Sequence, residues 1–167
     1  MPIENSQSMT EKAGKYLTFG LGDEEYGLEI LKVREIIGMM KVTRVPGAPD
    51  FVRGVINLRG KVIPVIDLRL KFAMPPQPDT EKTCIIVVQV RMDQRAAAMG
   101  VIVDEVREVI DIKADQIEPP PVFGASVQTE FILGMGKISQ KISTLLDIDR
   151  ALSAGEARMV EQAVEGS

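Results

Sequence analysis

An internal repeat constrains the fold of this 167-residue chain more than any other feature of its sequence. Residues 27–37 (GLEILKVREII) align with residues 100–110 (GVIVDEVREVI), and the Gly, Val, Arg, Glu and last Ile are identical. A second match follows at an offset of 80 positions, where a Gly, a Lys and an Asp within 54–67 recur within 134–147. Two matches in the same order predict two copies of one small unit, each of about 60–70 residues.

The residue types predict that this unit is made of strands. The apolar residues are mostly Val, Ile and Leu, with two Tyr, five Phe and no Trp, and β-branched side chains favour strands. We therefore expect a mainly all-β protein of two pseudo-repeated β-barrel subdomains packed together, with short helices and a C-terminal helix. The expected parts are a flexible leader (1–14), a first barrel (roughly 22–72), a linker with three prolines (73–82), a second barrel (roughly 83–148), with strand exchange possible at the ends, and a C-terminal helix or tail (153–167).

Each copy of the repeat contains a predicted hairpin. In the first copy, strands over 55–58 and 61–66 are expected to flank a turn at Arg59-Gly60. The matching hairpin is expected over 131–148. Asp67 follows the first hairpin and is expected to cap a short helix, because Asp accepts hydrogen bonds from the first free N–H groups of a helix.

The small size of each unit has a consequence for how the two copies pack. A barrel of this size buries only roughly 60% of the surface that its unfolded chain exposes, so each copy alone is marginally stable. Packing the copies against each other adds a shared apolar core. We hypothesise that a groove between them is the docking place of an elongated partner.

The inventory of reactive side chains argues against an enzyme. The sequence contains no His, which removes the commonest general base and metal ligand, and Cys84 is its only cysteine. We expect no catalytic residue, no metal and no cofactor, although an enzyme that uses only carboxylates and Lys stays open. Asp67 and Asp147 occupy equivalent positions, so they form either a carboxylate dyad or two helix caps. Cys84 lies in an apolar run and is expected to be a small buried hydrophobe rather than a reactive thiol.

Charge is unevenly distributed along the chain. The net charge is −4, but residues 28–72 carry nine Lys/Arg against four Asp/Glu. This basic stretch is either a solvated surface or a surface that steers an acidic protein partner. It offers only Phe51 and Phe72 for base stacking, so nucleic-acid binding is not expected. No apolar run approaches the roughly 20 residues that cross a bilayer, and residues 1–14 lack a secretory signal, so we expect a cytoplasmic protein without membrane insertion.

Several segments resemble the CheW family of bacterial chemotaxis coupling proteins. The most specific are GVINLRG (54–60) and PVIDL (64–68), and the further matching segments are YGLEILKVREII (26–37), RVPG (44–47), FVRG (51–54) and GVIVDEV (100–106). The likeness runs over a CheW-like domain of about 15–152. It implies two intertwined SH3-like β-barrels that couple the cytoplasmic tips of methyl-accepting chemoreceptors to the regulatory domain of the histidine kinase CheA. It also implies a non-catalytic adaptor, a monomer when free, that is recruited to membrane receptor arrays.

The resemblance further implies where partners bind. The receptor-facing surface is expected around Val33, Glu35, Gly54 and Arg59. Glu35 and Arg59 are expected on neighbouring strands, as an ion pair that either holds the Arg fork for the partner or only braces the barrel. Gly54 either meets a backbone need or admits a partner, and Val33 is either a contact or part of the core.

The kinase is expected to bind the second barrel, on residues that the sequence does not identify. This second copy has Ser139-Gln140 in place of the Arg-Gly turn, so the two halves are not expected to bind the same target. Two alternatives stay open. One is a CheW-like adaptor of another receptor–kinase pathway, such as motility or gene regulation, and the other is a small-ligand-binding β-barrel with a closed apolar pocket.

Overall fold

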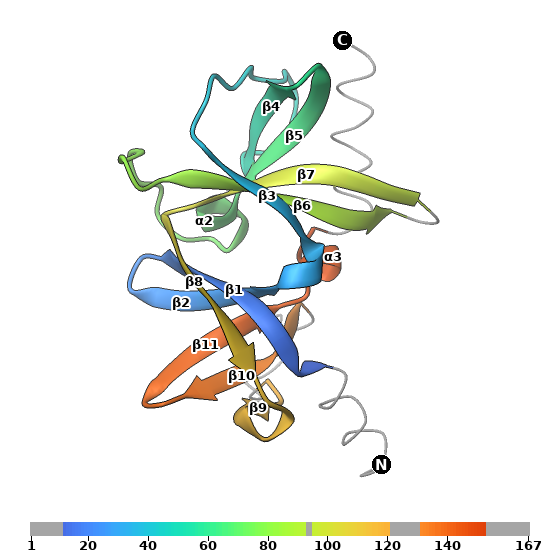
Figure 1. Ribbon diagram of the computed structural model, residues 1–167. Coiled ribbons are helices and arrows are strands. Elements are labelled where there is room, and N and C mark those ends of the chain that lie inside the picture. The colour runs from blue at the N-terminus through green and yellow to red at the C-terminus, as the bar shows by residue number, and fades with distance from the viewer. Residues whose placement is uncertain (1–11, 93–94, 121–130, 153–167) are drawn as a thin grey trace.

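The structure, a computed structural model, describes residues 12–92, 95–120 and 131–152. Two β-sheets form its framework (Figure 1). The six-stranded sheet has the order β8-β1-β2-β11-β10-β9 and the five-stranded sheet the order β3-β6-β7-β5-β4. The strands are β1 (Gly14–Leu21), β2 (Glu24–Glu29), β3 (Val33–Gly38), β4 (Val52–Leu58), β5 (Lys61–Asp67), β6 (Cys84–Met92), β7 (Arg95–Val103), β8 (Glu105–Ile112), β9 (Ile117–Glu118), β10 (Ile132–Ile138) and β11 (Lys141–Leu146). The short helices are η1 (Ile30–Lys32), α2 (Leu68–Lys71), η2 (Ala114–Gln116) and α3 (Ile148–Ala151). The prediction of a mainly β protein with two SH3-like subdomains is confirmed.

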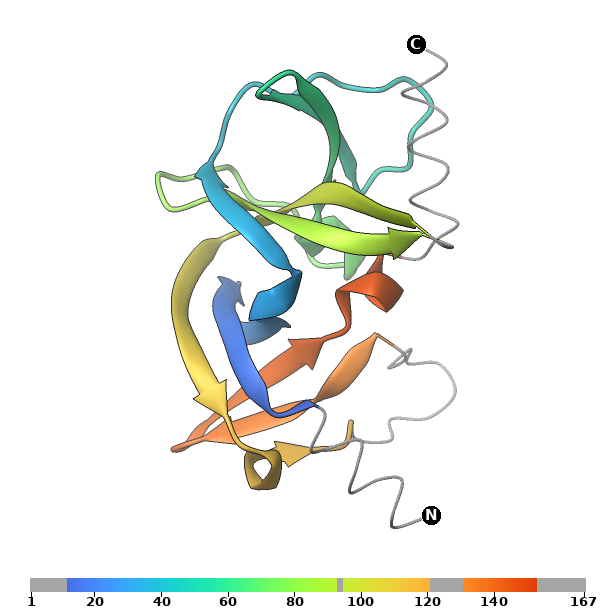
Figure 2. The same cartoon turned by 45° about the vertical axis from the view of Figure 1, so that its right-hand side comes forward.

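The boundaries predicted for the two barrels, 22–72 and 83–148, are wrong. β1 and β2 pair with the C-terminal strands β8 to β11, whereas β6 and β7 join β3 to β5. Figure 2 shows the chain passing from one sheet to the other through β8, which descends from the level of β7. Strand exchange therefore involves two strands of each subdomain rather than the ends alone. Physically, each sheet is completed by a parallel ladder, β2 with β11 and β5 with β7, between segments far apart in the sequence.

The repeat found in the sequence is a structural pseudo-symmetry. Gly27 is the register partner of Leu145 in the β2–β11 ladder, and Gly100 is the partner of Val65 in the β5–β7 ladder. Gly27 and Gly100 are 73 positions apart, and Val65 and Leu145 are 80 positions apart, which are the two offsets of the sequence repeat. The pseudo-symmetric relation predicted from the sequence is confirmed by these registers.

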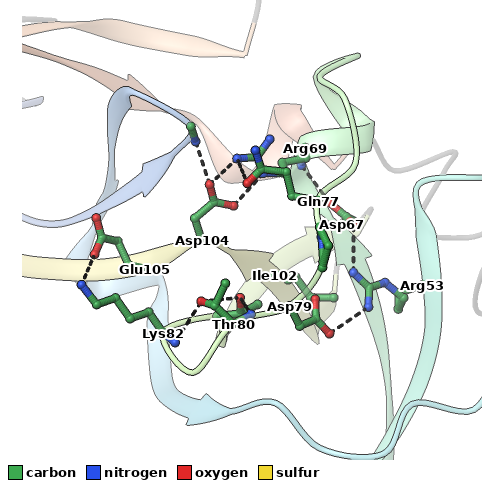
Figure 3. A pocket seen from close by; sticks show the side chains of 13 residues that line it. Arg53, Asp67, Arg69, Gln77, Asp79, Thr80, Lys82, Ile102, Asp104 and Glu105 are labelled. Atoms are coloured by element: carbon green, nitrogen blue, oxygen red, sulfur yellow. Dashed lines mark hydrogen bonds and ion pairs between the residues drawn. The ribbon is translucent and has the colours of Figure 1, made fainter.

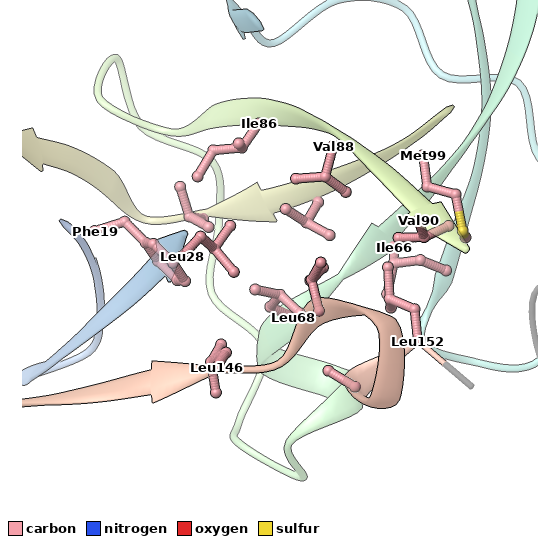
Figure 4. Close-up of a cluster of buried hydrophobic side chains, with 14 of the residues drawn as sticks. Phe19, Leu28, Ile66, Leu68, Ile86, Val88, Val90, Met99, Leu146 and Leu152 are labelled. Atoms are coloured by element: carbon pink, nitrogen blue, oxygen red, sulfur yellow. The ribbon is translucent and has the colours of Figure 1, made fainter. Parts of the chain in front are cut away.

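A large apolar cluster between the two sheets forms the shared core. Figure 4 shows side chains of both sheets converging on it, among them Phe19, Leu28, Ile86 and Leu146. These four side chains are at most 1% exposed. Its buried members among the described residues come from β1, β2, β4 to β7, β11, the helices α2 and α3, and Leu152 directly after α3. Burial of this cluster stabilises both subdomains at once, because each sheet supplies part of the apolar surface that covers the other.

Each subdomain also has a smaller core of its own. In the five-stranded subdomain the buried members are Ile56, Ile63, Val65, Ile85, Val87 and Ile102. In the six-stranded subdomain they are Tyr16, Ile112, Ile117 and Leu145. One cluster is thus shared by both sheets, and one further cluster lies within each subdomain. Each sheet curves so that it encloses its own cluster on one side and covers the shared cluster on the other.

Both predicted hairpins and both predicted caps are present. β4 and β5 flank the turn at Arg59-Gly60, and β10 and β11 form the matching hairpin. The Asp67 carboxylate accepts hydrogen bonds from the N–H groups of Arg69 (3.0 Å) and Leu70 (3.4 Å) at the start of α2. Asp147 accepts a hydrogen bond from the N–H of Arg150 (3.2 Å) at the start of α3. The two aspartates are therefore helix caps rather than a dyad.

The predicted linker over 73–82 contains neither helix nor strand. β1 begins at Gly14, one residue inside the predicted leader. The rest of that leader up to residue 11, the turn expected at 93–94 and the predicted C-terminal helix beyond residue 152 lie outside the described residues.

Candidate functional site

The open end of the five-stranded subdomain brings Glu35 and Arg59 together. Glu35 lies on β3 and Arg59 in the turn that follows β4. β3 and β4 are the two edge strands of this sheet, so the two side chains meet because the sheet curls round on itself. The Arg59 guanidinium donates a hydrogen bond to the Glu35 carboxylate across that seam. The predicted ion pair is present, but the prediction that it joins neighbouring strands is wrong. The pair closes the mouth of the barrel between its two edges.

Arg59 is held at this place by its backbone as well as by its charge. It occupies the turn between β4 and β5 with φ of 52°, in the left-handed region that few non-glycine residues adopt. Gly60 follows with φ of 85°, and its N–H donates to the Asn57 side chain at 2.9 Å. The Arg59 side chain is 69% exposed, against 31% for Glu35. Because it is this exposed, the Arg59 side chain offers most of its surface to a partner. An ion pair at such an exposed place contributes only about 0.2–1 kcal/mol to stability.

A β-bulge places a second charged side chain at the same mouth. Val33 pairs with Val88 and Glu35 with Val87, so the register slips by one residue at Arg34. A bulge of this kind re-aims side chains, because two residues on one strand face one residue on the other. Arg34 and Glu35, although consecutive, therefore both line the mouth.

The mouth itself is a small depression of about 200 Å³ with an apolar floor and a charged rim. The floor residues are Leu58, Ile63, Val87 and Ala98, and the rim residues are Arg34, Glu35, Arg59 and Lys61. The rim therefore carries three cations and one carboxylate. Arg34 and Lys61 are not among the residues predicted to bind a partner. The signal in the sequence that could have found them is the local excess of Lys and Arg over 28–72.

Gly54 lies beside the segment around Thr43, which crosses over β4, rather than at the mouth. Its φ is 147°, and a Cβ atom built on it lies 2.1 Å from the carbonyl oxygen of Thr43. Thr43 in turn exchanges two backbone hydrogen bonds of 2.8 Å with Val55. Gly54 is buried, and the space beside its Cα is filled by the protein's own backbone. Close packing of Thr43 accounts for the glycine without a partner.

Val33 faces the shared core rather than the mouth. It is half-buried at the start of β3 and packs against the large apolar cluster. The structure thus brings Glu35 and Arg59 together and leaves Val33 and Gly54 outside that contact.

The six-stranded subdomain has an equivalent mouth with different chemistry. The depression is wider, about 760 Å³, and its lining includes Glu108 and Ser139 at the positions equivalent to Glu35 and Arg59. Ser139 keeps the left-handed backbone, with φ of 55°, but its short side chain supplies no cation. Glu25 also lines this mouth and pairs with Arg107 at 3.1 Å. The second mouth therefore lacks the Glu–Arg closure of the first.

A polar cluster links the two subdomains on one side of the junction (Figure 3). The Arg69 side chain, 8% exposed, donates to both carboxylate oxygens of Asp104, from Nε at 2.7 Å and from a terminal nitrogen at 2.5 Å. It also donates to the carbonyl oxygen of Pro75 (3.1 Å) and to Gln77 (3.0 Å), which anchors the segment between α2 and β6. The N–H of Gly22, in the β1–β2 turn, donates to Asp104 at 2.7 Å.

These contacts explain the electrostatics of the junction. The hydrogen bond from Arg69 holds the pKa of the Asp104 carboxyl below its ordinary value, against the opposing effect of burial. The same pairing raises the pKa of Arg69. The adjoining cavity of about 270 Å³ is lined by further ion-paired residues, including Arg53, which donates to Asp67 at 3.0 Å. Because these charges are paired with one another, the cluster serves to hold the two subdomains together.

The remaining candidates for chemistry have structural explanations. Cys84 is half-buried in β6, and burial raises the pKa of its thiol, which disfavours the reactive thiolate. Within the three described stretches, no group of three or more Cys, Asp or Glu side chains is arranged to hold a metal ion. The described helices include none that is both long and apolar enough to span a membrane.

The fold and its two mouths define the class first: a double β-barrel of the SH3-like kind with charged surface mouths. The family model described as "CheW-like domain" matches residues 15–156 of this chain. The chain is 43% identical over 147 residues to "Chemotaxis protein CheW" of Klebsiella aerogenes, which covers 88% of this chain and 86% of the relative. It is 36% identical over 148 residues to the Helicobacter pylori protein of the same name, covering 89% and 87% of the two chains.

A solved structure agrees with these relatives. The scaffolding protein TtCheW of Thermoanaerobacter tengcongensis superimposes with a TM-score of 0.76 at 35% identity, covering 84% of this chain and 93% of that protein. The chain belongs to the CheW family.

Proposed function

We propose that this protein is a non-catalytic scaffold that couples chemoreceptors to the histidine kinase CheA in bacterial chemotaxis. The observation that carries the proposal is the match to the CheW family over 15–156, together with relatives named as chemotaxis proteins. The scaffold acts by linking two binding events, so its contribution to signalling is a coupling free energy rather than a bond-making step. Because receptor tips and the kinase lie in the cytoplasm, the protein acts there and is recruited to membrane receptor arrays.

The proposed receptor-binding region is the mouth closed by Glu35 and Arg59. Arg59 is highly exposed, its guanidinium is oriented by Glu35, and its position is fixed by the turn. An oriented Arg fork on a rigid turn is suited to binding, since little conformational freedom is lost when a partner arrives. In this proposal Val33 and Gly54 support the region from behind, through the shared core and the Thr43 crossing.

The proposed kinase-binding region is the six-stranded subdomain. Its mouth lacks the Arg, is wider, and presents Glu108, Ser139 and Lys141 instead. Val109 (50% exposed) and Ile142 (59% exposed) add apolar surface on the same subdomain. Different chemistry on the two mouths supports different partners for the two halves.

A pull-down of the purified protein with the cytoplasmic fragment of a chemoreceptor and a CheA kinase from the same organism tests the coupling. We expect all three proteins to be recovered together. Recovery of neither partner, with a melting temperature that instead rises with a small metabolite, would replace the scaffold by a ligand-binding barrel. Recovery of a different receptor–kinase pair would assign the scaffold to another pathway.

The role of Arg59 is tested by comparing Arg59→Asn with Glu35→Gln. Asn tolerates the left-handed backbone, so Arg59→Asn removes the guanidinium without straining the turn. We expect receptor binding to weaken at least about fivefold in Arg59→Asn and less in Glu35→Gln, because in this proposal Arg59 contacts the partner whereas Glu35 only orients Arg59. Ser139→Asn, at the equivalent turn, is the matched control and is expected to bind normally. Equal loss of binding and of stability in both variants would mean that the pair is only a brace.

A further inference from the structure

Among the described residues, two cations at the first mouth, Arg34 and Lys61, are not engaged in ion pairs. Arg34 and Lys61 are both exposed. Within the part of the chain that the structure describes, neither forms an ion pair or a side-chain hydrogen bond, whereas Arg59 beside them is paired with Glu35. They stand on opposite sides of the seam, Arg34 at the bulge of β3 and Lys61 at the start of β5. Their charges are thus left available at the rim of one depression.

The floor of the depression defines what can enter it. Ile63 and Val87 are 5% and 2% exposed and, with Leu58 and Ala98, form an apolar surface. At about 200 Å³ the depression is smaller than the roughly 300–1,000 Å³ that ligand pockets occupy, so it suits one side chain rather than a cofactor. The rim above this floor carries two more positive than negative charges.

We propose that this mouth recognises an acidic segment of the receptor tip, in which one apolar side chain enters the depression and flanking carboxylates meet Arg34 and Lys61. This inference rests on the proposed function, and it adds the chemical class of the partner surface and two residues that select it. Complementary charge is the reason for choosing this occupant: unpaired cations on the rim attract carboxylates, increase the association rate and repel basic partners.

The pseudo-symmetric half supplies an internal comparison. Lys141 is the exposed equivalent of Lys61, 80 positions later, and lines the other mouth. There its charge is accompanied by Glu25 and Glu108 rather than by cations. The equivalent of Arg34 is Arg107, which forms ion pairs with Glu25 and Glu105. The second mouth is therefore formed by the equivalent strands, but its one cation, Lys141, is outnumbered by the carboxylates of Glu25 and Glu108.

The test measures binding of the receptor cytoplasmic fragment to the full-length protein and to the variants Lys61→Gln, Arg34→Gln/Lys61→Gln and Lys141→Gln. Both residues are exposed, so the variants are expected to fold, which circular dichroism verifies. We expect Lys61→Gln to bind about threefold and the double variant about tenfold more weakly, as for exposed charge pairs. Lys141→Gln is expected to bind as the original protein does.

Ionic strength provides the second readout. Raising the salt from about 0.05 M to about 0.5 M should weaken binding of the original protein and weaken the double variant much less, because salt screens exposed charges. Wild-type affinity in the double variant, or an equal loss in Lys141→Gln, overturns the charge recognition while the scaffold function stands. Failure of the original protein to bind the receptor fragment at any salt concentration overturns both.

Discussion

The two subdomains share one strand plan but differ at their open ends. In the five-stranded subdomain, Glu35 and Arg59 close the mouth across the two edge strands. In the six-stranded subdomain, Glu108 and Ser139 occupy the same positions, and the mouth is wider. The backbone at the turn is nearly identical, with φ of 52° at Arg59 and 55° at Ser139. The repeat therefore preserves the framework while the side chains at the mouths have diverged, which is the pattern expected if the two halves bind different partners.

The junction between the subdomains shows the same divergence with inverted charge. The residue two positions after the capping aspartate is Arg69 in one copy and Asp149 in the other. Arg69 pairs with Asp104, whereas Asp149 pairs with Lys32 at 2.8 Å. Each carboxylate also accepts a backbone N–H from a turn or strand of the opposite subdomain. Both sides of the junction are thus tied, but only the Arg69 side is buried.

The largest expected effect on stability distinguishes Gly54, which packs against Thr43, from its equivalent Gly134, which packs against Glu118. Gly54→Ala should destabilise the protein by about 3–5 kcal/mol, since the new methyl group meets the Thr43 backbone at a φ that Ala rarely adopts. Gly134→Ala should cost only about 1–2 kcal/mol, because its nearest backbone atom, the Glu118 oxygen, is 2.8 Å away rather than 2.1 Å. Urea denaturation of both variants measures the difference, and equal losses would contradict it.

A smaller effect is expected at the junction. Asp104→Asn should lower the free energy of unfolding by about 2 kcal/mol, because it leaves the buried Arg69 without a counter-charge. Asp149→Asn, the pseudo-symmetric control, should cost less than about 1 kcal/mol, since Lys32 and Asp149 are about one-third and one-quarter exposed. Chemical denaturation near pH 7 compares them.

Acid titration sharpens the junction prediction. The pKa of Asp104 is lower in the folded protein than its ordinary value of about 3.9. Its contribution to stability is therefore fully present above about pH 4 and is lost as the pH falls through the lowered folded pKa. The difference in urea midpoint between the original protein and Asp104→Asn should shrink on acidification below pH ~4. A difference independent of pH would show that the loss is steric rather than electrostatic.

The smallest effect is expected from exchanging the mouths. Ser139→Arg places a guanidinium opposite Glu108 on a backbone that already has the required φ. Arg59→Ser removes the closure of the first mouth. We expect a gain and a loss of about 0.5 kcal/mol, as for exposed ion pairs, and both should fade in high salt. Thermal denaturation at two salt concentrations measures them, and salt-independent changes would argue against closure by charge.

Local features of the fold were predictable from the sequence. The Arg59-Gly60 turn and the cap at Asp67 follow from short-range patterns, and the equivalence of Gly27 with Gly100 follows from the sequence repeat. The sheet membership of β1, β2, β6 and β7 did not follow, because both halves of the repeat offer apolar strands of similar length and type. The ion pair between Glu35 and Arg59 was predicted through resemblance, but its place across the seam was not.

The sequence by itself determined that the protein has two similar β units, where their turns and caps lie, and that it contains no His and a single Cys. The turns and caps depend on residue type and on spacing over a few positions, and the two units on a repeat at offsets of 73 and 80 positions. Only the tertiary structure decided which strands complete each sheet, that Arg34 turns to the mouth, and that Arg69 joins the subdomains. Those outcomes depend on the parallel ladders and on the shared core, in which the free energy comes from surfaces contributed by distant parts of the chain.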